Sequence, residues 1–188
     1  MNLTYSTNIV ILGGGIAGLW LLNRMQAEGL DPILFETRAL GGKQTLASQG
    51  IIHGGLKYAL KGALGEDSKN IANMPNRWRE CLNGSGEVDL TGVKVLDENY
   101  YMWSDGGFRS RLKSYLGSKS LRGRVDVVSK DRYPDFFRES SAKGTLYKLP
   151  DFVIDTNSLL QKLVSSSHGR ILSLTNCKYK FLAEENTP

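Results

Sequence analysis

The chain has 188 residues, of which 40% are hydrophobic and 23% are charged, and its formal net charge is +5. This composition favours one globular domain with a smaller insertion and excludes a disordered chain. The sequence contains no apolar run of membrane-spanning length and no secretory pattern, and its two cysteines and two histidines are too scattered for a metal site. We therefore expect a cytoplasmic protein without a bound metal.

The first 36 residues predict a strand–helix–strand unit. Residues 8–12 are apolar and β-branched, which is typical of a buried strand. Residues 16–28 predict a helix that ends near Gly29, and residues 32–35 predict a second strand that closes with Glu36. Two parallel strands joined in this way have a right-handed crossover.

The following segments have less regular hydrophobic patterns. Residues 37–57 predict an extended loop with a short helix at 45–49, and residues 69–82 predict a helix. Residues 83–86, with the sequence NGSG, predict a turn. From residue 88 to 138 short strand-like runs alternate with turn signals, which indicates an inserted, strand-rich layer.

The last segments return to regular structure. Residues 147–154 predict an extended apolar strand, residues 155–164 a helix with a start signal at Asp155, and residues 169–174 another strand. We expect an α/β fold in three parts: a first part at 1–82 that begins with the strand–helix–strand unit, a strand-rich insertion at 83–148 and a return to the first part at 149–188.

Three glycines between the first strand and the first helix carry the main chemical signal. Gly13, Gly15 and Gly18 fit the G-x-G-x-x-G pattern, in which the glycines permit a tight turn, the approach of a diphosphate and close packing of helix on strand. Glu36 ends the next strand, where a carboxylate can accept hydrogen bonds from ribose hydroxyls. The alternative is a ligand-free turn with a solvated Glu36.

Residues 41–60, GGKQTLASQGIIHGGLKYAL, distinguish among dinucleotides. An NAD-binding unit would continue with further strand–helix repeats, and this stretch has glycines and small polar residues instead. Ser48 and the segment from His53 to Tyr58 resemble the FAD-dependent oxidoreductases of the D-amino-acid oxidase and glycerol-3-phosphate dehydrogenase superfamily, with Lys57 in place of the more usual arginine. Residues 149–163 resemble that family's return from the substrate domain to the FAD domain.

The resemblance implies a Rossmann-type FAD-binding domain, FAD as cofactor and hydride transfer to the flavin from a small hydroxy- or amino-bearing substrate. The candidate FAD contacts are Gly13, Gly14, Gly15, Ile16, Ala17, Gly18, Glu36, Thr37, Arg38, Gly42, Lys43, Gln44, Ser48, Gln49, Gly50, Ile51 and His53. His53 is also the candidate catalytic base or covalent flavin attachment point, and the alternative is a loop histidine held by backbone carbonyls.

Several other residues have competing interpretations. Lys57 and Tyr58 fit either a flavin contact or the protein surface, and Ser48 and Gln49 fit either FAD contacts or the end of a short helix. Residues 108–124 contain six basic residues and no acidic one, which favours a solvated face over an anionic substrate or nucleic acid. We expect Trp20 and Trp78 to pack in the core, and Cys81 and Cys177 to be unreactive.

Complete members of the resembled family carry a second half that finishes both domains, and the sequence after Gly169 does not supply it. We therefore expect an N-terminal portion or one polypeptide of a split flavoenzyme, with an exposed apolar surface that a second polypeptide or a second copy covers. The rival interpretation is a catalytically incomplete dinucleotide-binding module. An NAD-dependent dehydrogenase is a more distant alternative.

Overall fold

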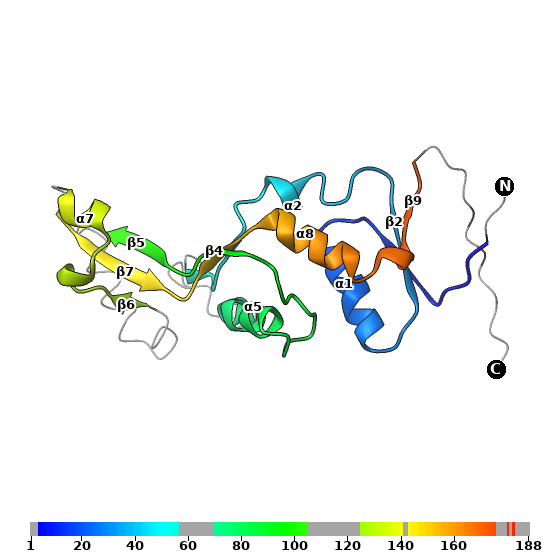
Figure 1. Ribbon diagram of the computed structural model, residues 1–188, viewed down its shortest axis with the longest axis horizontal. Coiled ribbons are helices and arrows are strands. Elements are labelled where there is room, and N and C mark those ends of the chain that lie inside the picture. Colours follow the sequence, from blue (N-terminus) through cyan, green and yellow to red (C-terminus); the bar gives the residue numbers. More distant parts are fainter. Residues whose placement is uncertain are drawn as a thin grey trace.

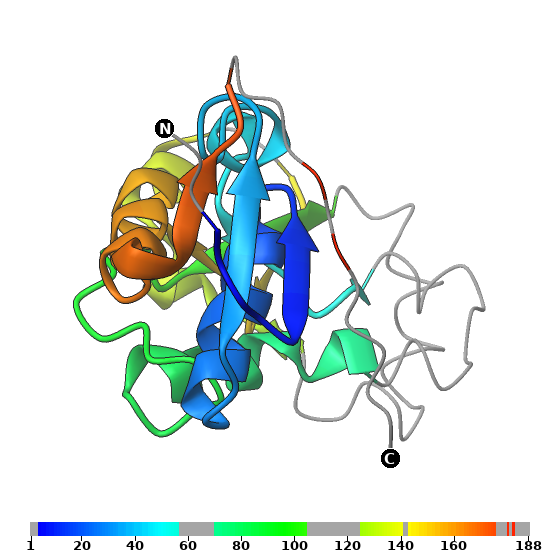
Figure 2. The same ribbon diagram turned by 90° about the vertical axis from the view of Figure 1, so that its right-hand side faces the viewer.

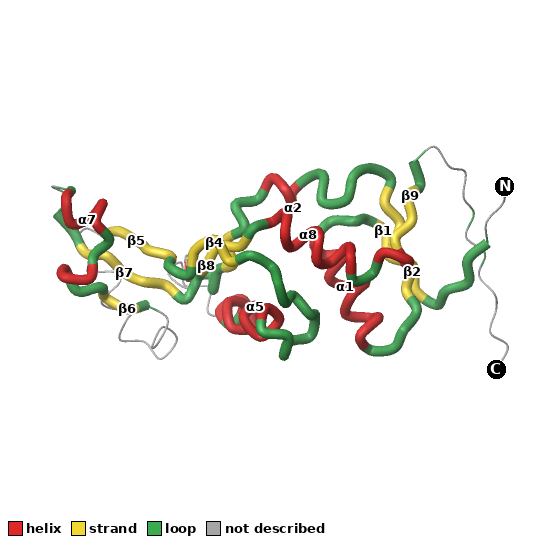
Figure 3. Tube along the Cα trace, viewed as in Figure 1, coloured by secondary structure: helices red, strands yellow, loops and turns green. Residues whose placement is uncertain are grey.

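The computed structural model describes residues 4–56, 70–104, 125–140 and 143–175, together with residues 180 and 182. The molecule is elongated, and its strands form three separate three-stranded sheets that follow one another along the long axis (Figure 1; Figure 3). Lys57, Tyr58, Cys177 and the basic stretch at 108–124 lie outside the described residues.

The first sheet contains the predicted strand–helix–strand unit. Strands β1 (Ile9–Leu12) and β2 (Pro32–Glu36) are parallel, and helix α1 (Ile16–Ala27) connects them. Gly29 follows the helix with a φ of +78°, which fits the glycine end predicted for it. Strand β9 (Ile171–Ser173) is parallel to β2 on its other side, so the predicted last strand returns to this sheet.

The second sheet begins inside the segment that the sequence predicted as a loop. Helix α2 (Gln44–Ala47) is followed by strand β3 (Ile51–Ile52), which was not predicted. Two residues are too few for a period-2 pattern, and this strand exists because it pairs with β8 (Phe152–Ile154), about 100 residues later in the chain. Strand β4 (Val95–Asp97) pairs with the other edge of β8, and helix α5 (Met74–Leu82) lies beside β3.

The third sheet is the strand-rich end of the molecule. Strand β7 (Thr145–Leu149) lies between β5 (Tyr100–Ser104) and β6 (Asp126–Val127). A 3₁₀ turn (Lys130–Arg132) and helix α7 (Asp135–Glu139) follow β6, and neither was predicted. The predicted single strand at 147–154 is two strands, because the chain leaves the third sheet at Pro150, which has no N–H to donate, and enters the second sheet at Phe152.

Helix α8 (Thr156–Ser165) packs with α1 on one face of the first sheet, and Figure 2 shows both helices behind the sheet. As predicted, Asp155 caps α8, since its carboxylate accepts hydrogen bonds from the N–H groups of Asn157 and Ser158. A 3₁₀ turn (His168–Arg170) connects α8 to β9. Fully buried side chains form the core between these elements: Leu19, Leu22, Leu34, Leu90, Phe152 and Leu163.

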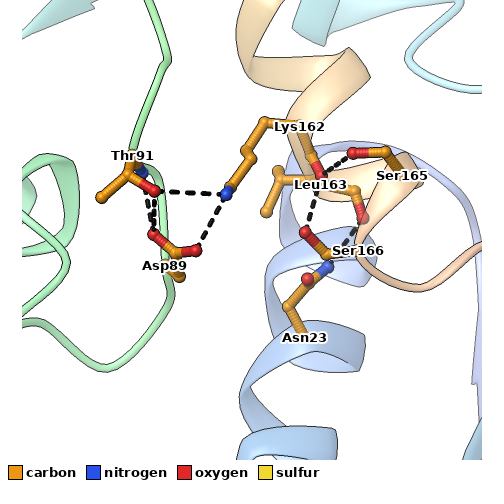
Figure 4. Close-up of polar contacts among 7 residues, drawn as sticks. All are labelled: Asn23, Asp89, Thr91, Lys162, Leu163, Ser165 and Ser166. Carbon is orange, nitrogen blue, oxygen red and sulfur yellow. Dashed lines mark hydrogen bonds and ion pairs between the residues drawn. The ribbon is translucent and has the colours of Figure 1, made fainter.

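Polar contacts fix α8 against its neighbours (Figure 4). The Asn23 side-chain amide donates to the carbonyl of Leu163 at 2.9 Å and so joins α1 to α8. The Lys162 ammonium donates to the Asp89 carboxylate at 2.8 Å and so joins α8 to the loop after α5. These contacts hold three separate chain segments together behind the first sheet. Within the residues that the structure describes, no helix has the length and apolarity needed to cross a membrane.

Candidate functional site

The turn between β1 and α1 has the geometry that the glycine pattern predicts. Gly13 has a φ of +106°, a conformation that favours glycine, and its N–H donates to the carbonyl of Phe35 at 2.8 Å. A Cβ on Gly18 would lie 2.0 Å from the carbonyl oxygen of Gly13, so only glycine lets α1 pack this closely on the turn. Gly15 has no such conflict: its nearest neighbour would be the Thr45 hydroxyl, at an ordinary 3.5 Å.

The N-terminus of α1 presents backbone donors. The N–H of Ile16 donates to the Thr45 hydroxyl at 2.9 Å. Within the described part of the chain, the N–H groups of Gly15 and Ala17 have no acceptor, and the first turn contains no acidic side chain. Unpaired amides and the positive end of the helix dipole together favour an anion such as a phosphate.

Glu36 lies against the glycine turn. One carboxylate oxygen accepts the N–H of Gly14 at 2.7 Å, and the other accepts the N–H of Arg38 at 2.8 Å. These bonds, that of Gly14 above all, hold the pKa of Glu36 below its usual value, so the carboxylate stays ionised at neutral pH. The backbone N–H and the hydroxyl of Thr37 also interact with this carboxylate, so the hydroxyl groups of a ligand would share its lone pairs with Thr37.

Two cavities adjoin the glycine turn. The first, of about 300 Å³, is here called the Glu36 cavity and is lined by Glu36, Arg38, Leu40, Val164, His168, Ile171, Leu172 and Ser173. The second, of about 500 Å³, is called the His53 cavity and is lined by Ile16, Gln44, Thr45, Ser48, Gln49, Gly50, Ile51, Ile52, His53, Trp78, Ile154, Thr156 and Leu159. Glu36 connects the first cavity to the turn through Gly14, and Ile16 begins α1 at the second.

The structure gathers most of the candidate residues around these two spaces. Those that line the His53 cavity are Ile16, Gln44, Ser48, Gln49, Gly50, Ile51 and His53, and those that line the Glu36 cavity are Glu36 and Arg38. The turn between the cavities consists of Gly13, Gly14, Gly15, Ala17 and Gly18. Thr37, Gly42 and Lys43 line neither cavity and are exposed.

Sequence reasoning missed the walls that distant segments supply. Trp78 was expected in the core; it contacts Trp20, with ring centroids 4.8 Å apart, but it also lines the His53 cavity. Ile154, Thr156 and Leu159 reach the cavity because β8 pairs with β3. The resemblance of residues 149–163 to a returning segment was the one signal that could have placed them there.

Other candidate residues have local roles. The Ser48 hydroxyl donates to the carbonyl of Thr45 at 2.9 Å, which is the helix-end role that the sequence left open. Burial raises the pKa of the Cys81 thiol, which therefore stays protonated and unreactive, as expected. Among the residues with described positions, no three His, Cys, Asp or Glu side chains gather as a metal site would require.

A strand–helix–strand unit with a glycine turn, an acid at the second strand end and a cavity beyond the turn defines a dinucleotide-binding protein. The model of the family "FAD dependent oxidoreductase" (DAO) matches residues 8–172, and the chain therefore belongs to this family, which binds FAD. The family resemblance seen in the sequence is thus confirmed.

One relative is the "Probable FAD-dependent oxidoreductase PA4991" of Pseudomonas aeruginosa, which is 46% identical over 168 residues, 89% of this chain and 43% of the relative. The crystal structure of the P. aeruginosa protein matches with a TM-score of 0.71 and 36% identity in the structural alignment, over 92% of this chain and 40% of that one. This chain thus spans less than half the length of the relative.

Two further comparisons show more distant similarities. Glycine oxidase from Geobacillus kaustophilus shares the fold, with a TM-score of 0.63 at 14% identity, over 92% of this chain and 47% of that chain. The anaerobic glycerol-3-phosphate dehydrogenase of Haemophilus influenzae has one polypeptide that is 34% identical over 55 residues, 29% of this chain and 10% of the relative.

Proposed function

We propose that this chain binds FAD across the glycine turn, with the adenosine at Glu36 and its cavity and the flavin in the His53 cavity. The observation that carries the proposal is that two cavities adjoin the turn, one through Glu36 and the other through Ile16, with nine candidate residues lining them. An extended dinucleotide needs three adjoining subsites, for adenosine, diphosphate and the second ring system, and this arrangement offers all three.

In this proposal the N–H groups of Gly15 and Ala17 bind the diphosphate, because they have no acceptor in the described part of the chain. Glu36 accepts hydrogen bonds from the ribose hydroxyls beside those from Gly14 and Arg38, in place of the weaker ones from Thr37. The same carboxylate disfavours a ribose 2′-phosphate, since both are negatively charged. The donor and acceptor set therefore fits FAD.

The proposed reaction is the oxidation of a small hydroxy- or amino-bearing substrate, such as a 2-hydroxy acid, a polyol phosphate or an amino acid. Bound FAD supplies the two-electron acceptor. His53 lines the cavity and is exposed, so its imidazole can either take a proton from the substrate hydroxyl or amine or contact the flavin. Ile16, Ile51 and Leu159 provide an apolar wall that excludes water from part of the cavity.

Visible absorption of the purified chain tests this proposal. We expect flavin bands in the protein as purified or after FAD is added and unbound FAD removed, and no comparable uptake of NAD. Flavin that stays with the protein after acid precipitation would indicate covalent attachment, and its loss in a His53→Ala variant would place that bond at His53. A colourless chain that takes up no FAD under these conditions would contradict the proposal.

A second candidate function is a dinucleotide-binding part that needs a partner polypeptide or a second copy for turnover. The observation that favours it lies on the face of the first sheet opposite α1 and α8, where none of the described helices lies in Figure 2. On β1, Val10 is 41% exposed and Leu12 is 70% exposed. Sedimentation of the purified chain at increasing concentration tests self-association, and a flavin-loaded monomer with oxidase or dehydrogenase turnover would exclude this candidate.

A further inference from the structure

Asp151 is a buried charged residue that the proposed chemistry does not use. It lies between β7 and β8, next to Pro150, and only 5% of it is exposed. The other buried polar residues among those described are Thr45, Ser104 and Ser167, none of which carries a charge. A buried carboxylate costs free energy unless specific partners compensate it, so its contacts need an explanation.

The hydrogen bond that compensates the buried carboxylate comes from a residue beside the His53 cavity. One oxygen of the Asp151 carboxylate accepts the N–H of Gly54 at 2.9 Å, a bond between residues 97 positions apart. Gly54 follows His53, which lines the cavity, and a Cβ on Gly54 would lie 3.6 Å from the same oxygen. The carboxylate therefore packs closely against the backbone that carries the His53 side chain.

A second set of contacts holds Asp151 in place. On α5, the Arg79 guanidinium donates to the carbonyl of Pro150 at 3.3 Å and lies over the Phe152 ring, 4.2 Å from its centroid. Glu98 binds the same guanidinium at 2.6 Å. The residues on both sides of Asp151 are thus fixed by one arginine, which makes the carboxylate a firm support for Gly54.

The factors that shift the pKa of Asp151 involve the same two neighbours, Gly54 and His53. Burial raises the pKa of the Asp151 carboxyl, whereas the hydrogen bond from Gly54 and the charge of a protonated His53 lower it. Gly54 and His53 are thus the two groups that favour the ionised form of Asp151.

Strand β3 has only two residues, so its hydrogen bonds to β8 alone give little support to the segment that follows it.

We infer that Asp151 is a positioning residue that fixes the His53–Gly54 backbone and thereby sets the place of the His53 imidazole in the wall of the cavity. The relevance of this wall to FAD rests on the proposed function. The role of Asp151 in holding the wall does not depend on the proposed function, because the hydrogen bond to Gly54 is present in the chain itself.

The experiment compares Asp151→Ala and Asp151→Asn in the full chain. The asparagine keeps a carbonyl oxygen that can accept the Gly54 N–H, and the alanine removes it. Asp97→Ala is the matched control, because the Asp97 carboxylate also accepts a backbone N–H, that of Asn99 at 2.8 Å, but lies exposed outside the cavity. The readouts are hydrogen exchange of the Gly54 amide, the NMR resonances of the His53 ring, and titration with FAD.

In Asp151→Ala we expect Gly54 exchange to rise and FAD affinity to fall by on the order of tenfold each, since a hydrogen bond to a charged acceptor is lost. The His53 ring resonances should move, and Asp151→Asn should restore both the exchange rate and the resonances. Asp97→Ala should leave all three readouts unchanged.

The inference is overturned if Gly54 exchange and the His53 resonances are the same in Asp151→Ala as in the unchanged chain. If Asp151→Ala does not fold, two other results overturn the inference. One is rapid exchange of the Gly54 amide in the unchanged chain. The other is an Asp151→Asn variant in which the His53 resonances move while the Gly54 amide stays protected. If the unchanged chain binds no FAD, the proposed function fails, while the exchange and NMR comparison still decides the role of Asp151.

Discussion

The close approach of α1 to the glycine turn predicts whether alanine at Gly18 raises or lowers the free energy of unfolding. In the interior of an exposed helix, alanine in place of glycine stabilises a protein by about 1 kcal/mol. At Gly18 the new Cβ would lie 2.0 Å from the carbonyl oxygen of Gly13 and 3.4 Å from the Leu34 side chain. The first contact is with backbone, which cannot rotate away, so the helix or the turn has to move.

Overpacking costs about 1–3 kcal/mol, and a 2.0 Å contact with backbone belongs at the upper end of that range, so it outweighs the gain of about 1 kcal/mol in helix propensity. We expect Gly18→Ala to lower the free energy of unfolding by about 1–2 kcal/mol, or the melting temperature by about 2–8 °C for a domain of this size. Urea denaturation followed by tryptophan fluorescence measures this change in the free energy of unfolding. Gly169→Ala is the control, because no atom lies within 4 Å of its Cβ position. A Gly18→Ala variant that is more stable than the unchanged chain would refute the reasoning.

Three further substitutions test other contacts. Glu36→Ala leaves two backbone N–H groups without their acceptor and should cost about 1–2 kcal/mol of stability in urea denaturation, whereas an unchanged midpoint would contradict the bonds at the turn. Trp78→Phe should reduce the quenching of tryptophan fluorescence by added FAD, because Trp78 lines the His53 cavity, and quenching equal to that of the unchanged chain would place FAD elsewhere. Asp89→Asn removes the ion pair with Lys162, and since the Asp89 side chain is 59% exposed the cost at neutral pH should stay below about 1 kcal/mol. The hydrogen bonds from Lys162 and Thr91 lower the pKa of Asp89 from 3.8 to about 2, so this stability difference should shrink as the pH falls through that interval, and an undiminished difference at pH 2 would contradict it.

Local signals were sufficient for the first part of the fold. The β-branched run, the glycine pattern and Gly29 predicted β1, the turn and α1 within one residue of their bounds, and Asp155 marked the start of α8. These features depend on residues close together in the chain, so propensity and capping rules apply to them.

Long-range pairing explains what could not be predicted. Strand β3 exists only because β8 returns to pair with it, and no pattern within two residues records that partner. Trp78 reaches the His53 cavity for the same reason, since α5 lies beside β3. The Asp151–Gly54 bond joins residues 97 positions apart, so its place in the candidate site is visible only in three dimensions.

Gly15 gives the most direct test of the account. An alanine there meets nothing closer than the Thr45 hydroxyl at 3.5 Å, so Gly15→Ala should keep the fold, with a stability loss below about 1 kcal/mol at the helix N-cap. Its methyl group would occupy the space proposed for the diphosphate. Titration of both chains with FAD should therefore show binding to the unchanged chain and a loss of at least about tenfold in the variant. Equal FAD affinity in the two stably folded chains would contradict the proposed dinucleotide site.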